Sequence, residues 1–294
     1  MVKYQKCSDL KRTFAFLIDI FIAFLIGVVL FTIPSLIFQQ TDSYKNNLET
    51  INAVKKESGL FKNDQNLDIY LENEDLTIKE RYEYLDNAIK NFYKNSNFFS
   101  EDKKTEYDLR KKEAVVDDKN LFILEDGEYV NSMLNISDNE YYAFYKNEYY
   151  SYALPSLSSI VSYKDANQNI LSAYNVILIV SALLSLFIVF FLIPVFQKRN
   201  RSTIGMKIFK IGLISNSGFA LSIKEFAFRF LFLYCVELIL GFFSFLIIPF
   251  ISFSMMIFGN KHEPFHDLLI NSRAIDVSNS LIYLYEYDFN IKNS

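Results

Sequence analysis

Residues 13–38 read TFAFLIDIFIAFLIGVVLFTIPSLIF, and this stretch decides the fold. It holds one charged side chain, Asp19, and it is longer than the roughly 20 apolar residues that a bilayer-spanning helix needs. Residues 174–196 and 226–258 are also nearly free of charge. These three stretches predict an α-helical, multi-pass protein of the cell membrane, in contact with the lipid bilayer.

Basic residues beside the apolar stretches predict the orientation of the chain, because positively charged short loops tend to stay in the cytoplasm. Residues 1–12 carry Lys3, Lys6, Lys11 and Arg12, and residues 197–225 carry Lys198, Arg199, Arg201, Lys207 and Lys210. Both segments are expected to be cytoplasmic, which places residues 39–173 outside. The first apolar run is far longer than the roughly 7 to 15 residues of a cleavable signal, so we expect a retained anchor.

The third stretch is too long for one straight span. Its 33 residues would form a helix of about 50 Å, whereas the hydrocarbon core of a bilayer is about 30 Å thick. A break around residues 241–244, helped by Pro249, would give two short helices in a full or re-entrant hairpin. The chain would then have about four membrane segments, with residues 259–294 as a cytoplasmic tail.

Residues 39–173 carry an acidic excess and patterned apolar side chains, which predict an inserted, extracytoplasmic α+β domain. In residues 76–95, apolar side chains recur at three- and four-residue spacings, as on one face of an amphipathic helix. An Asp-Gly pair between apolar runs predicts a hairpin within residues 121–133. Ser137 begins a capping-box pattern, and the helix that follows is expected to end at Pro155.

The ionisable residues within the spans are the main functional candidates. Asp19 follows Arg12 by seven positions, so both lie on roughly one face of the first helix. A mid-bilayer Asp costs roughly 2.5 to 3.5 kcal/mol on insertion scales, and Asp19 should therefore face protein or water. Arg229 and Glu237 in the third stretch raise the same question. We expect an ion pair between Asp19 and Arg229, at similar depth in the membrane.

Several motifs lie in order beside the predicted spans: Arg12 with Ala15 and Asp19, the run Thr203-Ile204-Gly205-Met206-Lys207, Arg229, His266-Asp267, and Arg273. Together they resemble the RDD family of integral membrane proteins, named after an Arg and two Asp that match Arg12, Asp19 and Asp267 here. The resemblance covers roughly residues 9–38 and 171–277 and implies a membrane core of that type. Cation/proton exchange has been proposed for some members, so the resemblance also implies transport.

Two functional hypotheses follow. In the first, Asp19, Arg229 and Glu237 line a polar path for a proton or a monovalent cation, which Asp19 accepts and Arg229 tunes. In the second, the protein is a non-enzymatic scaffold in which the same charges fix helix packing. Residues 39–173 would then bind a protein partner or an envelope component; they lie outside the resemblance because they are far longer than the loop usual there. Neither hypothesis includes an enzyme activity.

Residues 262–266, HEPFH, match the H-E-x-x-H pattern, in which one helix presents two His to a zinc ion. Pro264 between the two His disfavours a continuous helix, and the chain has no third His. The acidic outer segment lacks the spacing of an EF-hand calcium loop, although calcium binding there stays open. We therefore predict no metal and no cofactor, and we expect Asp267 in the tail to pair with a basic residue.

Residues 203–210 form an amphipathic segment after the second span. Gly205 and Lys207 suggest a phosphate loop, but its Gly-rich run and its Lys-Ser/Thr pair are missing. We interpret Thr203, Gly205 and Lys207 as part of an interfacial motif. We expect the lipid boundary to contain the side chains of Ile204, Ile208, Phe209 and Ile211. Anionic head groups would attract Lys207 and Lys210. Basic residues elsewhere are dispersed, so nucleic acid is not an expected partner.

The predicted orientation can be tested with single cysteines in a chain whose own Cys7 and Cys235 are replaced by Ser. A membrane-impermeant maleimide added to intact cells should label Asp126→Cys in the outer segment. Lys198→Cys in the cytoplasmic loop should react only after the membrane is permeabilised. Labelling in the opposite order would contradict the assignment.

Overall fold

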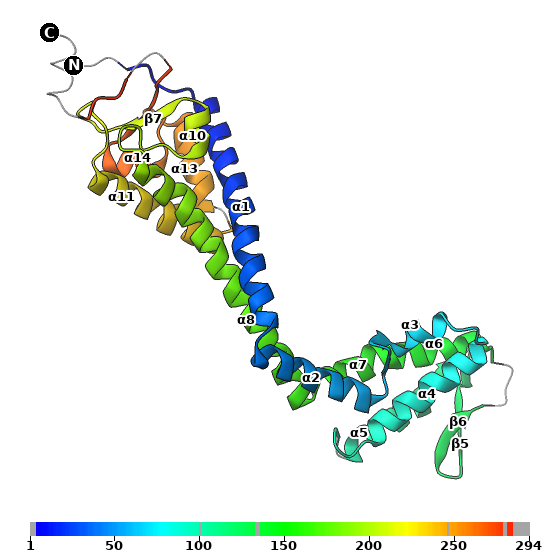
Figure 1. Cartoon of the computed structure of the whole chain (residues 1–294). Coiled ribbons are helices and arrows are strands. Elements are labelled where there is room, and N and C mark those ends of the chain that lie inside the picture. Colours follow the sequence, from blue (N-terminus) through cyan, green and yellow to red (C-terminus); the bar gives the residue numbers. More distant parts are fainter. Residues whose placement is uncertain (1–3, 100, 133–135, 246, 279–280, 285–294) are drawn as a thin grey trace, which may run out of the picture. The chain divides into compact units, whose positions relative to one another are not determined.

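The computed structural model describes residues 4–99, 101–132, 136–245, 247–278 and 281–284. The chain forms two compact units (Figure 1). The core unit consists of Met1–Ile37 and Asn175–Ser294, and the inserted unit consists of Phe38–Tyr174.

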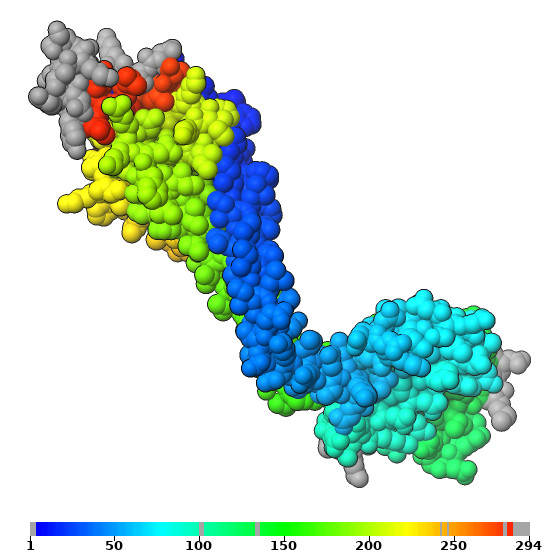
Figure 2. All heavy atoms as spheres, viewed as in Figure 1, coloured from blue at the N-terminus to red at the C-terminus, as the bar shows by residue number. Residues whose placement is uncertain are grey.

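Two long apolar helices run through the core unit. α1 spans Asp9–Gln39, and α8 spans Val161–Phe187 and continues through a π-helical turn, η2 (Ile188–Leu192), into α9 (Ile193–Phe196). α1 has 31 residues, and α8 together with η2 and α9 has 36. In the most apolar 18-residue stretch of each, only 17% and 22% of the stretch, respectively, is buried. A helix in the core of a soluble protein is mostly buried, so these two fit helices that face lipid. Side chains of α1 form part of the surface in Figure 2.

Small residues let α1 and α8 pack closely. Ser181 Oγ donates a hydrogen bond to the carbonyl of Leu30 at 2.9 Å. A Cβ on Gly27 would lie 3.3 Å from the hydroxyl of Ser185, and Ala23 of α1 is buried. Small residues at a helix contact allow two backbones to approach, which is a common basis of helix association in lipid.

The third apolar stretch forms a broken helical hairpin. Its first arm comprises α11 (Ile223–Leu231), the π-helix η3 (Phe232–Ile239) and α12 (Leu240–Phe243), and its second arm is α13 (Ile247–Phe258). Between the arms, Phe245 adopts a φ of +51°. Gly241 lets the arms approach, since a Cβ there would lie 2.7 Å from Pro249 Cδ. A break is present as expected, but it begins at Ser244, at the end of the expected residues 241–244, because α12 continues to Phe243. Membrane crossing by the two arms stays a prediction.

A cap of short elements lies at one end of the core unit (Figure 1). It comprises α10 (Ile204–Ile208), β7 (Ile211–Ile214), α14 (Phe265–Ile270) and β8 (Arg273–Asp276). β7 pairs antiparallel with β8, with Ile211 opposite Asp276, and Lys6 bridges to Ile275 of β8. All of β7 is buried. The expectation that Ile211 enters the lipid boundary is therefore wrong, because strand pairing places it in a buried cluster with Phe226.

The inserted unit combines helices with small hairpins. Its helices are α2 (Asp42–Ser58), α3 (Leu67–Glu72), α4 (Ile78–Lys94), α5 (Glu101–Glu113), α6 (Asp138–Glu148), η1 (Tyr149–Ala153) and α7 (Leu154–Ser159). Antiparallel pairs join β1 (Phe61–Lys62) with β2 (Gln65–Asn66), β3 (Val115–Val116) with β4 (Lys119–Asn120), and β5 (Phe122–Glu125) with β6 (Glu128–Asn131). Its extracytoplasmic location stays a prediction.

α4 supplies one side of the core of the inserted unit. The predicted helical face is confirmed, since its buried side chains include Tyr82, Leu85, Ile89 and Phe92. Ile78, an apolar residue near the start of the predicted stretch 76–95, is exposed because it is the first residue of the helix and precedes the packed turns. The buried face lies against α6, where the rings of Tyr82 and Tyr145 stack with centroids 6.0 Å apart.

Two local signals in the inserted unit have different outcomes. Asp126 and Gly127 close the β5–β6 hairpin with φ of +48° and +81°, which confirms the turn. Met133, at the end of that predicted segment, lies outside the described residues. Ser137 starts α6 with a capping box, as predicted. Pro155 does not end the helix, because η1 joins α6 to α7 and Pro155 occupies the first turn of α7, where its missing N–H is tolerated.

Leu85→Ala should lower the free energy of unfolding of the inserted unit by about 2 to 5 kcal/mol, because it removes a fully buried side chain from the core. Thermal or denaturant unfolding of the full chain in detergent measures this change. Leu124→Ala, at a side chain that is 62% exposed, is the matched control and should have little effect. Equal losses in both variants would contradict the assigned core.

Candidate functional site

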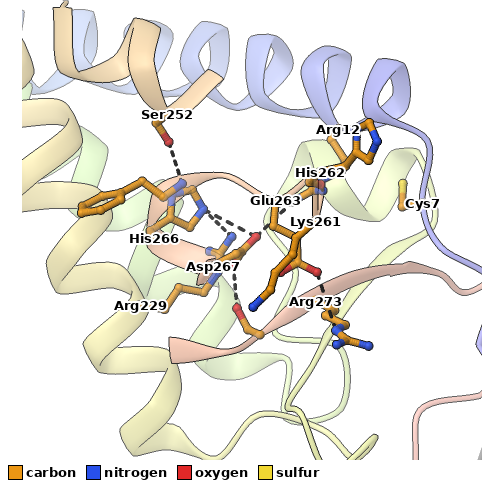
Figure 3. Close-up of polar contacts among 12 residues, drawn as sticks. Cys7, Arg12, Arg229, Ser252, Lys261, His262, Glu263, His266, Asp267 and Arg273 are labelled. Carbon is orange, nitrogen blue, oxygen red and sulfur yellow. Dashed lines mark hydrogen bonds and ion pairs between the residues drawn. The ribbon is translucent and has the colours of Figure 1, made fainter. Parts of the chain in front are cut away.

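Asp267 is the buried centre of a polar cluster in the core unit. Arg229 of α11 donates from Nε to Oδ1 at 2.6 Å, and Arg12 of α1 donates from Nη2 to Oδ2 at 3.1 Å. Ser272 Oγ also donates to Oδ1, at 2.6 Å. One carboxylate on α14 therefore connects the first helix, the hairpin and the cap (Figure 3). The expected pairing of Asp267 with a basic residue is confirmed.

The charges beside Asp267 keep it ionised. Burial disfavours its charged form, but the guanidiniums of Arg229 and Arg12 outweigh burial and hold the pKa of this carboxyl well below its usual range. The side chains of Arg229 and Arg12 are themselves only 12% and 8% exposed. Removing the carboxylate would leave two poorly solvated positive charges without a partner.

His266 connects Arg229 to Glu237. Arg229 Nη2 lies 2.9 Å from Nε2 of the imidazole, and Glu237 Oε1 lies 2.9 Å from Nδ1. A guanidinium nitrogen can only donate, so Nε2 accepts and the ring proton is assigned to Nδ1, which donates to Glu237. His266 is therefore neutral in this arrangement. Its backbone N–H donates to the same oxygen of Glu237 at 3.0 Å.

The π-helix η3 allows Arg229 and Glu237 to meet one imidazole. In a regular α-helix, eight residues advance by roughly 800°, which would place Glu237 about 80° around the axis from Arg229. The i→i+5 hydrogen bonds of η3 give a wider turn that advances less per residue. This local geometry brings the two side chains closer to one face of the helix.

Asp19 bonds to neutral donors and not to Arg229. Its two carboxylate oxygens accept hydrogen bonds from the hydroxyl of Thr203 and from the N–H of Gly205, the latter at 2.7 Å. The predicted Asp19–Arg229 ion pair is therefore wrong. In the cap, Asp267 lies against Arg229, and the start of α10 lies against Asp19. Neither contact can be predicted from the spacing of these residues in the sequence.

The run from Thr203 to Lys207 supplies the hydrogen-bond donors for Asp19. Thr203 is the N-cap of α10, and its hydroxyl accepts from the N–H of Met206 at 3.2 Å. Gly205 packs directly on α1, where a Cβ would overlap the backbone carbonyl of Ala15. Lys207 is exposed, as expected for an interfacial residue. The donor roles of Thr203 and Gly205 were missed, because they depend on the contact of α10 with α1, which no local pattern in the sequence shows.

A cavity of about 170 Å³ lies among these groups. Its ionisable lining comprises Arg12, Asp19, Arg229, Glu237, His266 and Asp267. Most of the remaining lining is apolar and includes Phe16, Phe190, Leu233, Leu238, Phe253 and Met256. The structure thus brings the five charged residues singled out in the sequence to one cavity.

The cavity lining has more negative than positive groups. The carboxylates of Asp19, Glu237 and Asp267 face only two guanidiniums, since His266 is neutral. Both guanidiniums bond to Asp267. Within the described residues Asp19 forms no ion pair, and its donors are neutral groups. With all three carboxylates ionised, the lining lacks one positive charge.

The two His of the HEPFH run have different partners. His262 precedes α14 with a φ of +51°, and its ring lies 3.6 Å from the Asp9 carboxylate. His266 lies within the helix and bonds to Glu237. Pro264 is the N-cap residue of α14, so the pattern does not lie on one continuous helix. Across the described ranges, no group of three or more His, Cys, Asp or Glu could hold a metal ion.

Comparison with known proteins agrees with the motifs in the sequence. A family model described as RDD family matches residues 144–271. The match contains Arg229 and Asp267, whereas Arg12 and Asp19 precede it. The match begins at residue 144, within residues 39–173, which we placed outside the resemblance. Residues 144–173 therefore belong to the match. No curated protein and no solved structure matches the chain.

Asp267→Asn should lower the free energy of unfolding by about 3 to 5 kcal/mol at neutral pH, because Arg12 and Arg229 stay buried without a counter-charge. The lowered pKa also sets the sign of the pH dependence. The contribution of Asp267 is complete above the unfolded pKa of about 4 and is lost as the pH falls below it. Acid should therefore destabilise the natural protein more steeply than the variant.

Thermal unfolding in detergent between neutral and acidic pH measures both effects. Asp165→Asn, at an exposed position of α8, is the matched control and should change neither the stability nor its dependence on pH. Equal destabilisation by the two substitutions would contradict the central role of Asp267.

Proposed function

Residues 144–271 form an RDD family domain in a membrane protein, and we propose that this protein exchanges a monovalent cation for a proton through its core unit. The proposed arrangement has four membrane segments, formed by α1, by α8 with α9, and by the two arms of the hairpin. Both termini would lie in the cytoplasm and the inserted unit outside, as the basic residues beside the spans indicate.

The unbalanced charge of the cavity lining is the observation that carries this proposal. Three carboxylates and two guanidiniums leave room for one additional positive charge. A proton or a monovalent cation can supply it, and the presence of one disfavours the other because like charges repel strongly where the dielectric constant is low. Competition of this kind at one site supports exchange of one ion for the other.

Asp19 is the residue that we assign to accept the proton or cation. Its donors, Thr203 and Gly205, are neutral, and a carboxylate retains acceptor capacity after two hydrogen bonds. Glu237 with His266 is a second group that can hold a proton in the same cavity. Arg229 acts on Asp19 only indirectly, since it bonds to Asp267 and His266 and thereby holds the cap against the helices.

A membrane scaffold is the second candidate function. The cluster around Asp267 can hold helices together without transporting anything. The inserted unit has a buried core of its own, in which Tyr145 and Tyr149 are fully buried, and a compact unit of this kind supports binding of a protein partner or an envelope component. In this function the charges of the core unit are structural.

Reconstitution into proteoliposomes tests the first candidate. Imposed gradients of protons and of sodium, potassium or methylammonium should drive counter-movement that a pH-sensitive dye detects. Asp19→Asn should abolish at least about nine-tenths of it, because the neutral amide cannot exchange a proton.

Asp165→Asn, at an exposed position of α8, is the matched control and should leave the flux unchanged. A monodisperse elution profile and an unchanged unfolding midpoint would show that Asp19→Asn still folds. Absence of Asp19-dependent movement under every gradient would favour the scaffold.

A further inference from the structure

We infer that the cation taken by this cavity is a small amphipathic ammonium ion, with the nitrogen at one end and a short apolar body at the other. The inference rests on the proposed exchange function and names the class of its substrate. It follows from three properties of the cavity: its size, its largely apolar wall and the position of its unpaired negative charge.

The size of the cavity sets the size of the ligand. Its volume is about 170 Å³. An engineered apolar cavity of about 150 Å³ in another protein binds benzene. The space here therefore suits a ligand of about six to nine non-hydrogen atoms, which is much larger than a bare alkali ion.

The apolar wall indicates the chemistry of the ligand body. Phe16 of α1 and Phe190 of η2 lie with ring centroids 5.9 Å apart and both line the cavity. Leu233 and Met256 contribute aliphatic and thioether surface from the two arms of the hairpin. Such a wall favours burial of hydrocarbon, and aromatic faces also attract an ammonium group.

The polar side of the cavity indicates the charge of the ligand. Asp19 has no basic partner within the described residues, and the hydroxyl-bearing residues Thr13 and Thr203 line the same cavity. A primary ammonium has three donors that a carboxylate and neighbouring hydroxyl oxygens can accept. The nitrogen would therefore bind at Asp19 while the body of the ligand lies against the Phe and Leu side chains.

A bare metal cation matches this lining less well. Hard cations require shells of about six or more oxygen ligands. Apolar side chains make up most of the wall here, and they offer no such ligands. An ammonium ion needs acceptors on one side only, so it can use the carboxylate without leaving the apolar wall unfilled.

Binding of benzylammonium to the full chain in detergent tests this inference. Calorimetric titration should show saturable binding. Thermal unfolding in the presence of benzylammonium should show a raised unfolding midpoint. Neutral benzyl alcohol at the same concentrations should give neither effect. Asp19→Asn should weaken the binding of benzylammonium about tenfold or more, which corresponds to about 1.4 kcal/mol and to the loss of one charge-assisted hydrogen bond.

A second pair of variants tests the cavity independently of Asp19. Leu238→Phe adds bulk to a side chain that lines the cavity and should also weaken benzylammonium binding about tenfold or more. Leu240→Phe makes the same change two positions later, at a side chain that is 50% exposed and outside the lining, and should bind like the natural protein. Binding that is equal in all variants, or equal for benzyl alcohol, would overturn the inference.

Flux measurements in the same preparation separate this inference from the proposed exchange. They are corrected with protein-free vesicles, because neutral benzylamine crosses lipid unaided. Asp19-dependent flux driven by benzylammonium would support both proposals. Flux driven by sodium or potassium without benzylammonium binding would overturn the ammonium class and leave exchange standing. Asp19-dependent binding without flux of any cation would leave an ammonium site and overturn exchange.

Discussion

The carboxylate of Asp267, buried between the guanidiniums of Arg12 and Arg229, is the interaction on which the core unit depends. Each of these charges alone would lose several kcal/mol of solvation on burial, so none of them can occupy the site without the others. Arg12 is 255 positions away from Asp267 in the chain, and Arg229 is 38 positions away. The pairing therefore holds the first helix, the hairpin and the cap in one arrangement.

The character of the cavity follows from this pairing. Because both guanidiniums are committed to Asp267, neither neutralises Asp19 or Glu237. Glu237 accepts a hydrogen bond from Nδ1–H of neutral His266, and Asp19 accepts hydrogen bonds from a hydroxyl and an amide N–H. Hydrogen bonds from neutral groups stabilise a carboxylate without cancelling its charge. The result is a largely apolar cavity with unbalanced negative charge, and such a lining favours a positively charged ligand.

Patterns that act over a few residues were the most predictive. The face of α4 follows from its spacing, and the turn at Asp126 and Gly127 follows from their tolerance of positive φ. The break in the third apolar stretch follows from its length. Pro155 shows the limit of such signals. A proline stops a helix only where its N–H would be needed. Here the π-helical turn η1 precedes Pro155, and a new helical segment, α7, begins at Leu154.

The sequence by itself determined that long apolar helices exist, and that Asp19, Arg229 and Glu237 must face protein or water, because both conclusions depend on the cost of exposing charge to lipid. Only the tertiary structure decided which charges meet. Partner choice depends on distances of about 3 Å between segments far apart in the chain. The pairing of β7 with β8, the wider turn of η3 and the close contact of Gly205 with α1 set those distances. For that reason Arg229 binds Asp267, and Asp19 faces the start of α10.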